Sequence, residues 1–93
     1  MNILWSAEAR KSLRAIRRFI AQDSEFYADQ MVTRIIERVE KSALSPSRGH
    51  RVHELPELRL KEIHEPPYRI IYEYDEGQLR VITIVHFKQR YKA

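Results

Sequence analysis

The chain has 93 residues, 43% of them hydrophobic, and its 17 Lys and Arg against 13 Asp and Glu give a formal net charge of +4. This length predicts a single domain, and the apolar share excludes a disordered tail. The absence of cysteine excludes a disulfide scaffold, a thiolate metal site and a cysteine nucleophile. No apolar run approaches the roughly 18 residues that a membrane span needs, and the positive charge favours acidic partners such as nucleic acid or an acidic protein.

The N-terminal residues predict a short strand followed by an amphipathic helix. Residues 2–5 contain good strand formers, and Ser6 is suited to cap a helix over residues 7–22. Apolar residues recur at helical spacing along that segment, and basic residues occupy the opposite and flanking arc. The arc is either a solvated surface or a docking face for an acidic partner. Its basic residues are Arg10, Lys11, Arg14, Arg17 and Arg18.

A second helix follows after a short break. The run Asp23-Ser24-Glu25 interrupts the first helix and is suited to cap another, which a broad apolar arc extends to about residue 44. A connection of two or three residues between two helices predicts an antiparallel helical hairpin. We interpret the methionine and aromatic positions of this segment as core rather than as a cofactor site.

After a loop over residues 45–50, the spacing of apolar residues changes to that of strands. Residues 58–63 predict a strand, which Glu65-Pro66-Pro67 ends because proline cannot donate to a ladder. Residues 68–74 alternate, so that Tyr68, Ile70, Tyr72 and Tyr74 share one face while Arg69, Ile71 and Glu73 share the other.

A hairpin turn and a last strand complete the chain. Asp75 to Gln78 forms the turn, in which Gly77 is free to adopt a positive φ. The run from Leu79 to Phe87 is nearly all β-branched, which indicates a strand that is central or covered on both faces. Residues 1–93 therefore predict one α+β domain: a strand, a helical hairpin, and a three-stranded antiparallel meander that the N-terminal strand extends to a four-stranded sheet.

The order and spacing of these motifs resemble the RelE/ParE superfamily of toxins from type II toxin–antitoxin modules. The resemblance rests on Trp5-Ser6-Ala7-Glu8-Ala9, the helical hairpin, the loop from Pro46 to Gly49, Tyr68-Arg69-Ile70-Ile71-Tyr72, and Val85-His86 followed by Arg90. It implies a small cytoplasmic growth inhibitor that needs no cofactor. It also implies a cognate antitoxin, acidic and partly disordered, that wraps the toxin. The candidate antitoxin-binding residues are Arg10, Arg14, Arg17 and Arg18.

The superfamily divides by target, because ParE-like members act on DNA gyrase whereas RelE-like members enter the ribosome and cleave mRNA. Cleavage by the ribose 2′-hydroxyl needs a base, an acid and a cation that holds the phosphate. If the chain is a nuclease, the candidate catalytic residues are Glu62, His64, Arg69, His86, Arg90 and Tyr91, which adjacent strands would bring onto one concave face. The candidates for binding phosphate or the target are Arg59, Lys61 and Lys88.

Structural roles compete with these assignments. Arg69 is equally suited to pair with Glu62 or Glu73 across the sheet, and His86 to bond to backbone at a strand end. The histidines show no metal-ligand spacing, so no metal site is predicted. The ending Val85 to Arg90 resembles ParE-like members more than RelE-like ones, which favours gyrase inhibition. A ribosome-dependent mRNA endonuclease and a non-toxic basic binding module are the alternatives.

Overall fold

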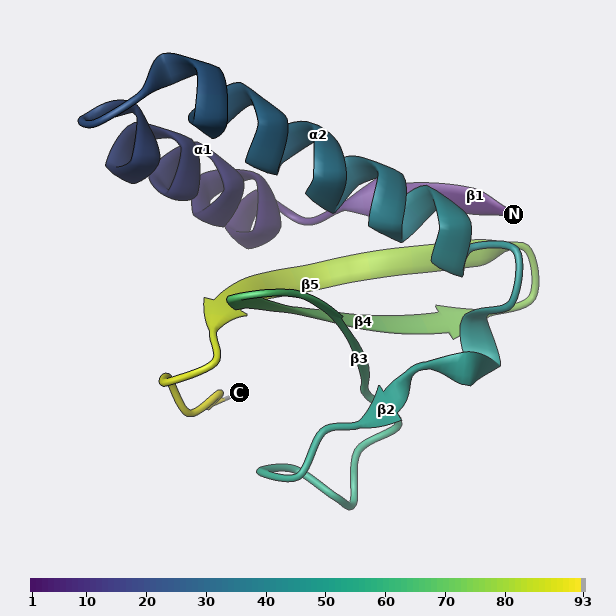
Figure 1. The fold of residues 1–93 in the computed structure, drawn as a ribbon. Helices are drawn as coiled ribbons and strands as arrows, with labels where there is room; N and C mark the ends of the chain where they lie inside the picture. Colours follow the sequence, from purple (N-terminus) through teal and green to yellow (C-terminus); the bar gives the residue numbers. More distant parts are fainter. Residues whose placement is uncertain (93) are drawn as a thin grey trace.

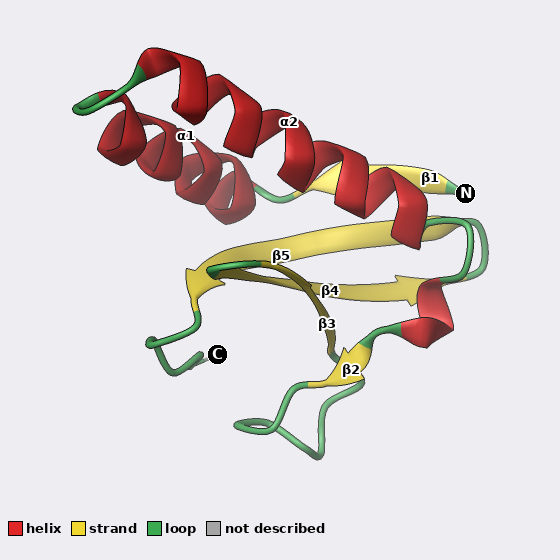
Figure 2. Cartoon of the chain, in the orientation of Figure 1, coloured by secondary structure: helices red, strands yellow, loops and turns green. Residues whose placement is uncertain are grey.

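The computed structural model describes residues 1–92 and confirms an α+β fold in which two helices lie on one side of a mixed sheet (Figures 1 and 2). The elements in chain order are β1 (Asn2–Trp5), α1 (Ala7–Ala21), α2 (Glu25–Ser42), a short 3₁₀ helix η1 (Pro46–Arg48), β2 (His50–Arg51), β3 (Lys61–Glu65), β4 (Tyr68–Asp75) and β5 (Gln78–His86).

The sheet has five strands in the order β1-β5-β4-β3-β2, rather than the four that the sequence predicts. The meander β3-β4-β5 is antiparallel as expected, and β5 is an interior strand between β4 and β1, but β1 pairs with β5 in parallel. The additional strand is β2, which begins at the last residue of the predicted loop and pairs with β3 through two residues. A strand of two residues carries no alternation that a sequence pattern can detect.

The predicted strand over residues 58–63 is displaced in the structure. β3 begins at Lys61 and extends to Glu65, which pairs with Tyr68 directly across the Pro66-Pro67 turn. Leu60 instead belongs to a buried cluster with Val52 and Ile71. The apolar alternation near residue 60 therefore reflects burial of a loop residue and not strand pairing.

The helical hairpin is capped as predicted and covers one face of the sheet (Figure 1). The Oγ of Ser6 accepts a hydrogen bond from the Ala9 N–H at 2.9 Å, and the Oγ of Ser24 accepts one from the Tyr27 N–H at 3.2 Å. Ile35 of α2 is fully buried in a core that includes Tyr68, Ile70 and Tyr72, three of the residues predicted to share one face of β4. Neither helix of the described chain is long and apolar enough to cross a bilayer.

No helix of residues 1–92 lies over the opposite face of the sheet. The loop between β2 and β3 covers part of it, and Tyr91 from the C-terminal segment packs there against the buried cluster of Val52, Leu60 and Ile71. Figure 1 shows this loop and the C-terminus on the side of the sheet away from the helices. The polar residues of β3 and β4 that face away from the helices therefore lie between two irregular segments.

Candidate functional site

The site is organised by Arg69, which β4 directs to the sheet face away from the helices. The pairing of β3 with β4 sets His64 opposite Arg69, and Glu62 lies two residues earlier on the same face of β3. Arg69 and Glu62 are only 8% and 5% exposed. Since charged residues are seldom this buried unless paired, partners are required.

Arg69 finds these partners in two carboxylates and one carbonyl. Its Nη1 and Nη2 each donate to Glu54 at 2.8 Å, and its Nε and Nη2 donate to Glu62 at 3.0 and 2.7 Å. Its Nη1 also donates to the Gln89 carbonyl at 3.1 Å. A guanidinium has five N–H donors, and these five bonds occupy them all. The expected pairing with Glu62 is confirmed, whereas Glu73 pairs with Arg80 instead.

The carboxylates are held in their charged form by this arrangement. Hydrogen bonds from Arg69 and then from the Tyr91 N–H lower the pKa of Glu54 to about 2. Burial alone would raise the pKa of Glu62, but hydrogen bonds from Arg69 and His64 outweigh it and lower that pKa. The two carboxylates in turn raise the pKa of Arg69. The three groups thus form a buried, ionised cluster, here called the Arg69 cluster: Glu54, Glu62 and Arg69.

The Arg69 cluster also fixes the C-terminal segment. Gln89 accepts from Arg69 through its carbonyl, and the Tyr91 N–H donates to Glu54 at 3.0 Å. The side chain of Gln89 accepts a further bond from the His86 N–H at 2.7 Å. The course of the chain after β5 is therefore set by contacts with β4 and with the loop that carries Glu54.

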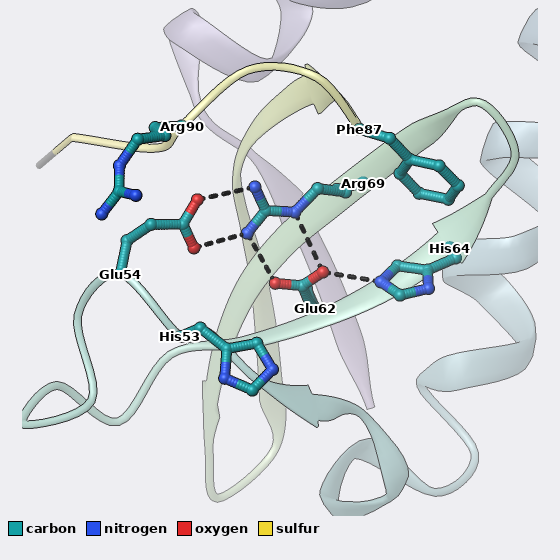
Figure 3. Close-up of a pocket in the computed structure, with 7 residues that line it drawn as sticks. All are labelled: His53, Glu54, Glu62, His64, Arg69, Phe87 and Arg90. Atoms are coloured by element: carbon teal, nitrogen blue, oxygen red, sulfur yellow. Dashed lines mark hydrogen bonds and ion pairs between the residues drawn. The ribbon is translucent and has the colours of Figure 1, made fainter.

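A hollow of about 440 Å³, here called the Arg69 hollow, opens beside this cluster (Figure 3). His64 donates through Nε2 to the ionised carboxylate of Glu62 at 2.6 Å, stacks on His50 with 5.1 Å between ring centroids, and meets Phe87 edge-on. Two arginines and two glutamates line the hollow, so their formal charges cancel. The lining residues are His53, Glu54, Glu62, His64, Arg69, Phe87 and Arg90.

The expectation that His86 joins this group is wrong, because His86 lies on the other face of the sheet. Its strand partner is Tyr68, and the two rings meet edge-on with 5.8 Å between centroids. Its Nδ1 accepts a bond from the Lys88 N–H at 3.1 Å, which confirms the structural alternative.

A β-bulge is the physical reason for this reversal. The two-residue turn pairs Asp75 with Gln78, and a regular ladder from there would set His86 on the face of Arg69. The register shifts between Ile71 and Tyr72, so that Ile82 is left without a partner. One extra residue moves every later side chain of β5 to the opposite face.

The remaining predicted residues are dispersed. Of the other catalytic candidates, Arg90 lines the Arg69 hollow, while Tyr91 packs against the cluster of Val52, Leu60 and Ile71 and burial raises the pKa of Tyr91. Arg59 and Lys61 line a different hollow, and Lys88 is exposed in the turn after β5. The four candidate antitoxin-binding arginines are all exposed on α1; they are Arg10, Arg14, Arg17 and Arg18.

Glu54 and Gln89 belong to the site although neither is among the residues predicted from the sequence. Glu54 is 15 positions before Arg69, in a segment of no regular structure. Gln89 contributes its backbone carbonyl, which carries no sequence signal at all. No spacing rule would have found either residue, although the buried position of Arg69 in an apolar strand indicates that acidic partners must exist.

We predict that Arg69→Ala lowers the free energy of unfolding by roughly 3–5 kcal/mol, because it leaves buried Glu62 without its cation. Urea denaturation measures this loss. Arg80 is the matched control, since it also contacts two carboxylates, Glu73 and Asp75, but in a more exposed setting. Arg80→Ala should cost much less, and equal losses for the two variants would show that burial of the cluster is unimportant.

The lowered pKa values predict that the protein loses stability in acid. Glu54 has its pKa lowered from 4.5 to about 2, so its contribution is complete above about pH 5 and is lost as the pH falls towards 2. The measurement is the free energy of unfolding across this range. Glu54→Gln should flatten the dependence, whereas Glu76→Gln in the exposed hairpin turn should leave it unchanged. A Glu54→Gln variant with the original slope would contradict the assignment.

The comparisons with known proteins agree with the resemblance noted in the sequence. Residues 3–91 match the family described as the ParE toxin of type II toxin–antitoxin system, parDE. Toxin RelE2 of Caulobacter vibrioides is 32% identical over 86 residues, which cover 91% of this chain and 93% of that protein. The structure of the chromosomal ParDE TA system from P. aeruginosa shares the fold, with a TM-score of 0.77 and 19% identity over 92% of this chain and 95% of that one. The chain therefore belongs to the ParE toxin family and is the toxin component of a type II toxin–antitoxin system, with a cognate antitoxin as its partner.

Proposed function

We propose that this toxin inhibits bacterial growth in the cytoplasm by acting on DNA gyrase, and that it does not itself cleave RNA. The single observation that carries the proposal is the complete occupation of the Arg69 guanidinium, whose five donors are bonded to Glu54, Glu62 and Gln89. Stabilising a pentavalent phosphate needs a cation with donors aimed at the developing charge. Arg69 has none left to offer.

The proton-transfer groups support the same conclusion. His86 is on the far face of the sheet, bonded to backbone. Glu62 has a lowered pKa, which makes its carboxylate a weak base at neutral pH. A nuclease requires a general base and a phosphate-binding arginine on one face. In this chain the two candidates, Glu62 and Arg69, are bonded to each other within the Arg69 cluster.

A ribosome-dependent mRNA endonuclease is the second candidate function. The observation that favours it is the hydrogen-bonded pair of Glu62 and His64, which lines the same hollow as Arg90. Arg90 belongs to no ion pair among residues 1–92, so it has donors for a phosphate. Membership of a toxin family disfavours the third alternative, a non-toxic basic binding module.

We further propose that the arginines of α1 form the contact surface for an acidic, partly disordered antitoxin. Arg14 and Arg18 belong to no ion pair of the described residues, whereas Arg17 contacts Asp29 at 3.0 Å. Phe19, on the same helix, is 69% exposed and adds apolar area beside these cations. The arginines would contact the carboxylates of an acidic antitoxin segment, and Phe19 would contact its apolar side chains as the segment folds on binding.

Inducing the toxin without its antitoxin tests the target. We expect growth to stop while mRNA stays intact, and DNA breaks and an SOS response to appear, because gyrase is stalled on DNA. RNA integrity and DNA damage are read side by side in the same culture. Arg90→Ala is the informative variant, since Arg69→Ala is expected to destabilise the fold and would confound the readout. Cleavage of mRNA at ribosome-positioned codons that disappears in Arg90→Ala would instead support the nuclease.

Reversing charge on α1 tests the antitoxin surface. We expect Arg14→Glu with Arg18→Glu to slow association with the antitoxin by about tenfold or more at low salt, because electrostatic steering is lost. Stopped-flow measurement over a range of salt concentrations gives the rate. Arg48→Glu with Lys92→Glu changes the net charge equally at other exposed positions. If both double variants slow association to the same extent, the net charge matters and the α1 face does not.

A further inference from the structure

A second hollow, of about 420 Å³, lies beside the β2–β3 end of the sheet and has a different electrostatic character from the first. Its charged lining comprises Arg51, Arg59 and Lys61 against the single carboxylate of Glu57, and Tyr74 contributes an aromatic ring. We call this the basic hollow. Its lining carries a formal excess of two positive charges, whereas the charges of the Arg69 hollow cancel.

Two cations of the basic hollow are cross-strand neighbours, so their like charges repel. Arg51 of β2 and Lys61 of β3 are directly opposite in the antiparallel ladder. Like charges in this position destabilise a sheet. Among residues 1–92, no ion pair includes Arg51, Arg59 or Lys61, and Lys61 has only the Gly49 carbonyl at 3.4 Å. An anion between the two side chains would relieve this repulsion.

The basic hollow is separate from the Arg69 hollow even though β3 contributes to both. Lys61 and Glu62 are consecutive strand residues, so their side chains point to opposite faces of the sheet. Tyr72 is the strand partner of Lys61, and Tyr74 is two residues further along β4, so Tyr74 lies on the same face of the sheet as Lys61. Substitutions in the basic hollow can therefore be made without touching the Arg69 cluster.

We propose that the basic hollow binds the phosphate of a nucleotide, with Arg51, Arg59 and Lys61 as donors and the ring of Tyr74 beside the base. Guanidinium and ammonium groups are the side chains that bind phosphate, and an aromatic face stacks on any base. The volume lies within the range of about 300–1,000 Å³ that small-molecule sites occupy. This proposal does not depend on whether the target of the toxin is gyrase or the ribosome.

Titration of the full chain, followed by backbone amide NMR at physiological ionic strength, tests this proposal. The probes are ATP, a short single-stranded oligodeoxythymidine with a 5′-phosphate, and polyglutamate as a polyanion without phosphate. We expect saturable shifts at residues 51, 59–61 and 74 with ATP, the oligonucleotide or both. ATP alone would identify a free nucleotide as the ligand, and the oligonucleotide alone would identify a nucleic-acid strand.

The decisive variant is Arg51→Glu, which replaces the like-charged pair with an opposite-charged one facing Lys61. We expect its affinity for the phosphate probe to fall about tenfold or more, while its melting temperature stays the same or rises. Arg18→Glu makes the same change of charge on α1 and should keep the affinity. Lys61→Gln, which introduces no new ion pair, should also weaken binding.

Three results would overturn the proposal. One is the absence of saturable shifts with either phosphate probe, or shifts confined to other parts of the chain. Another is an equal affinity of Arg51→Glu and Arg18→Glu for the probe. The last is polyglutamate binding at the same amides as tightly as the phosphate probes, because the hollow would then attract any polyanion.

Discussion

The guanidinium of Arg69 is held between two carboxylates from different parts of the chain, and the helix-free face of the sheet depends on this contact. Glu62 belongs to the neighbouring strand, but Glu54 belongs to the β2–β3 loop, and Gln89 and Tyr91 belong to the C-terminal segment. One buried cation on β4 therefore joins the paired strand β3 to two segments with little regular structure, the β2–β3 loop and the C-terminal segment. Removing it would leave buried carboxylates that repel each other, and would release the loop and the C-terminus together.

The same contact leaves Arg69 without a free N–H donor for a ligand, although it is the arginine that an apolar strand makes most conspicuous. Arg69 is the conspicuous charge in an apolar strand, and it is used entirely for holding the structure together. Among residues 1–92, the cations without a carboxylate partner include Arg14 and Arg18 on α1, and Arg51 and Lys61 beside the basic hollow. A toxin whose buried arginine is paired, and whose exposed Arg14, Arg18 and Arg51 have no carboxylate partner among the described residues, is suited to binding other molecules. This distribution fits inhibition of a large protein target better than catalysis by the chain itself.

Much of the fold follows from sequence patterns, and the failures have identifiable physical causes. Serine caps and helical spacing predict the hairpin, and the alternation around Ile70 correctly separates the two faces of β4. The two-residue strand β2 is too short to leave a pattern. The grouping of Arg69 with His86 is correct for a regular ladder and fails because of one bulged residue, Ile82. Bulges depend on packing between strands, which the spacing of residues along one strand does not record.

The register of β3 determines which of its side chains reach the basic hollow and which reach the Arg69 cluster. Lys61 and Glu62 are neighbours, and alternation directs one to the basic hollow and the other to the Arg69 cluster. A slip of one residue would exchange these faces, which would bring Lys61 against Arg69 and leave two cations buried together. The pairing of Glu65 with Tyr68 at the tight turn and the ion pairs of Glu62 both oppose such a slip. The Arg69 cluster thus contributes to the basic hollow indirectly. The ion pair of Glu62 with Arg69 fixes the register of β3, and this register keeps Lys61 on the opposite face, at the basic hollow.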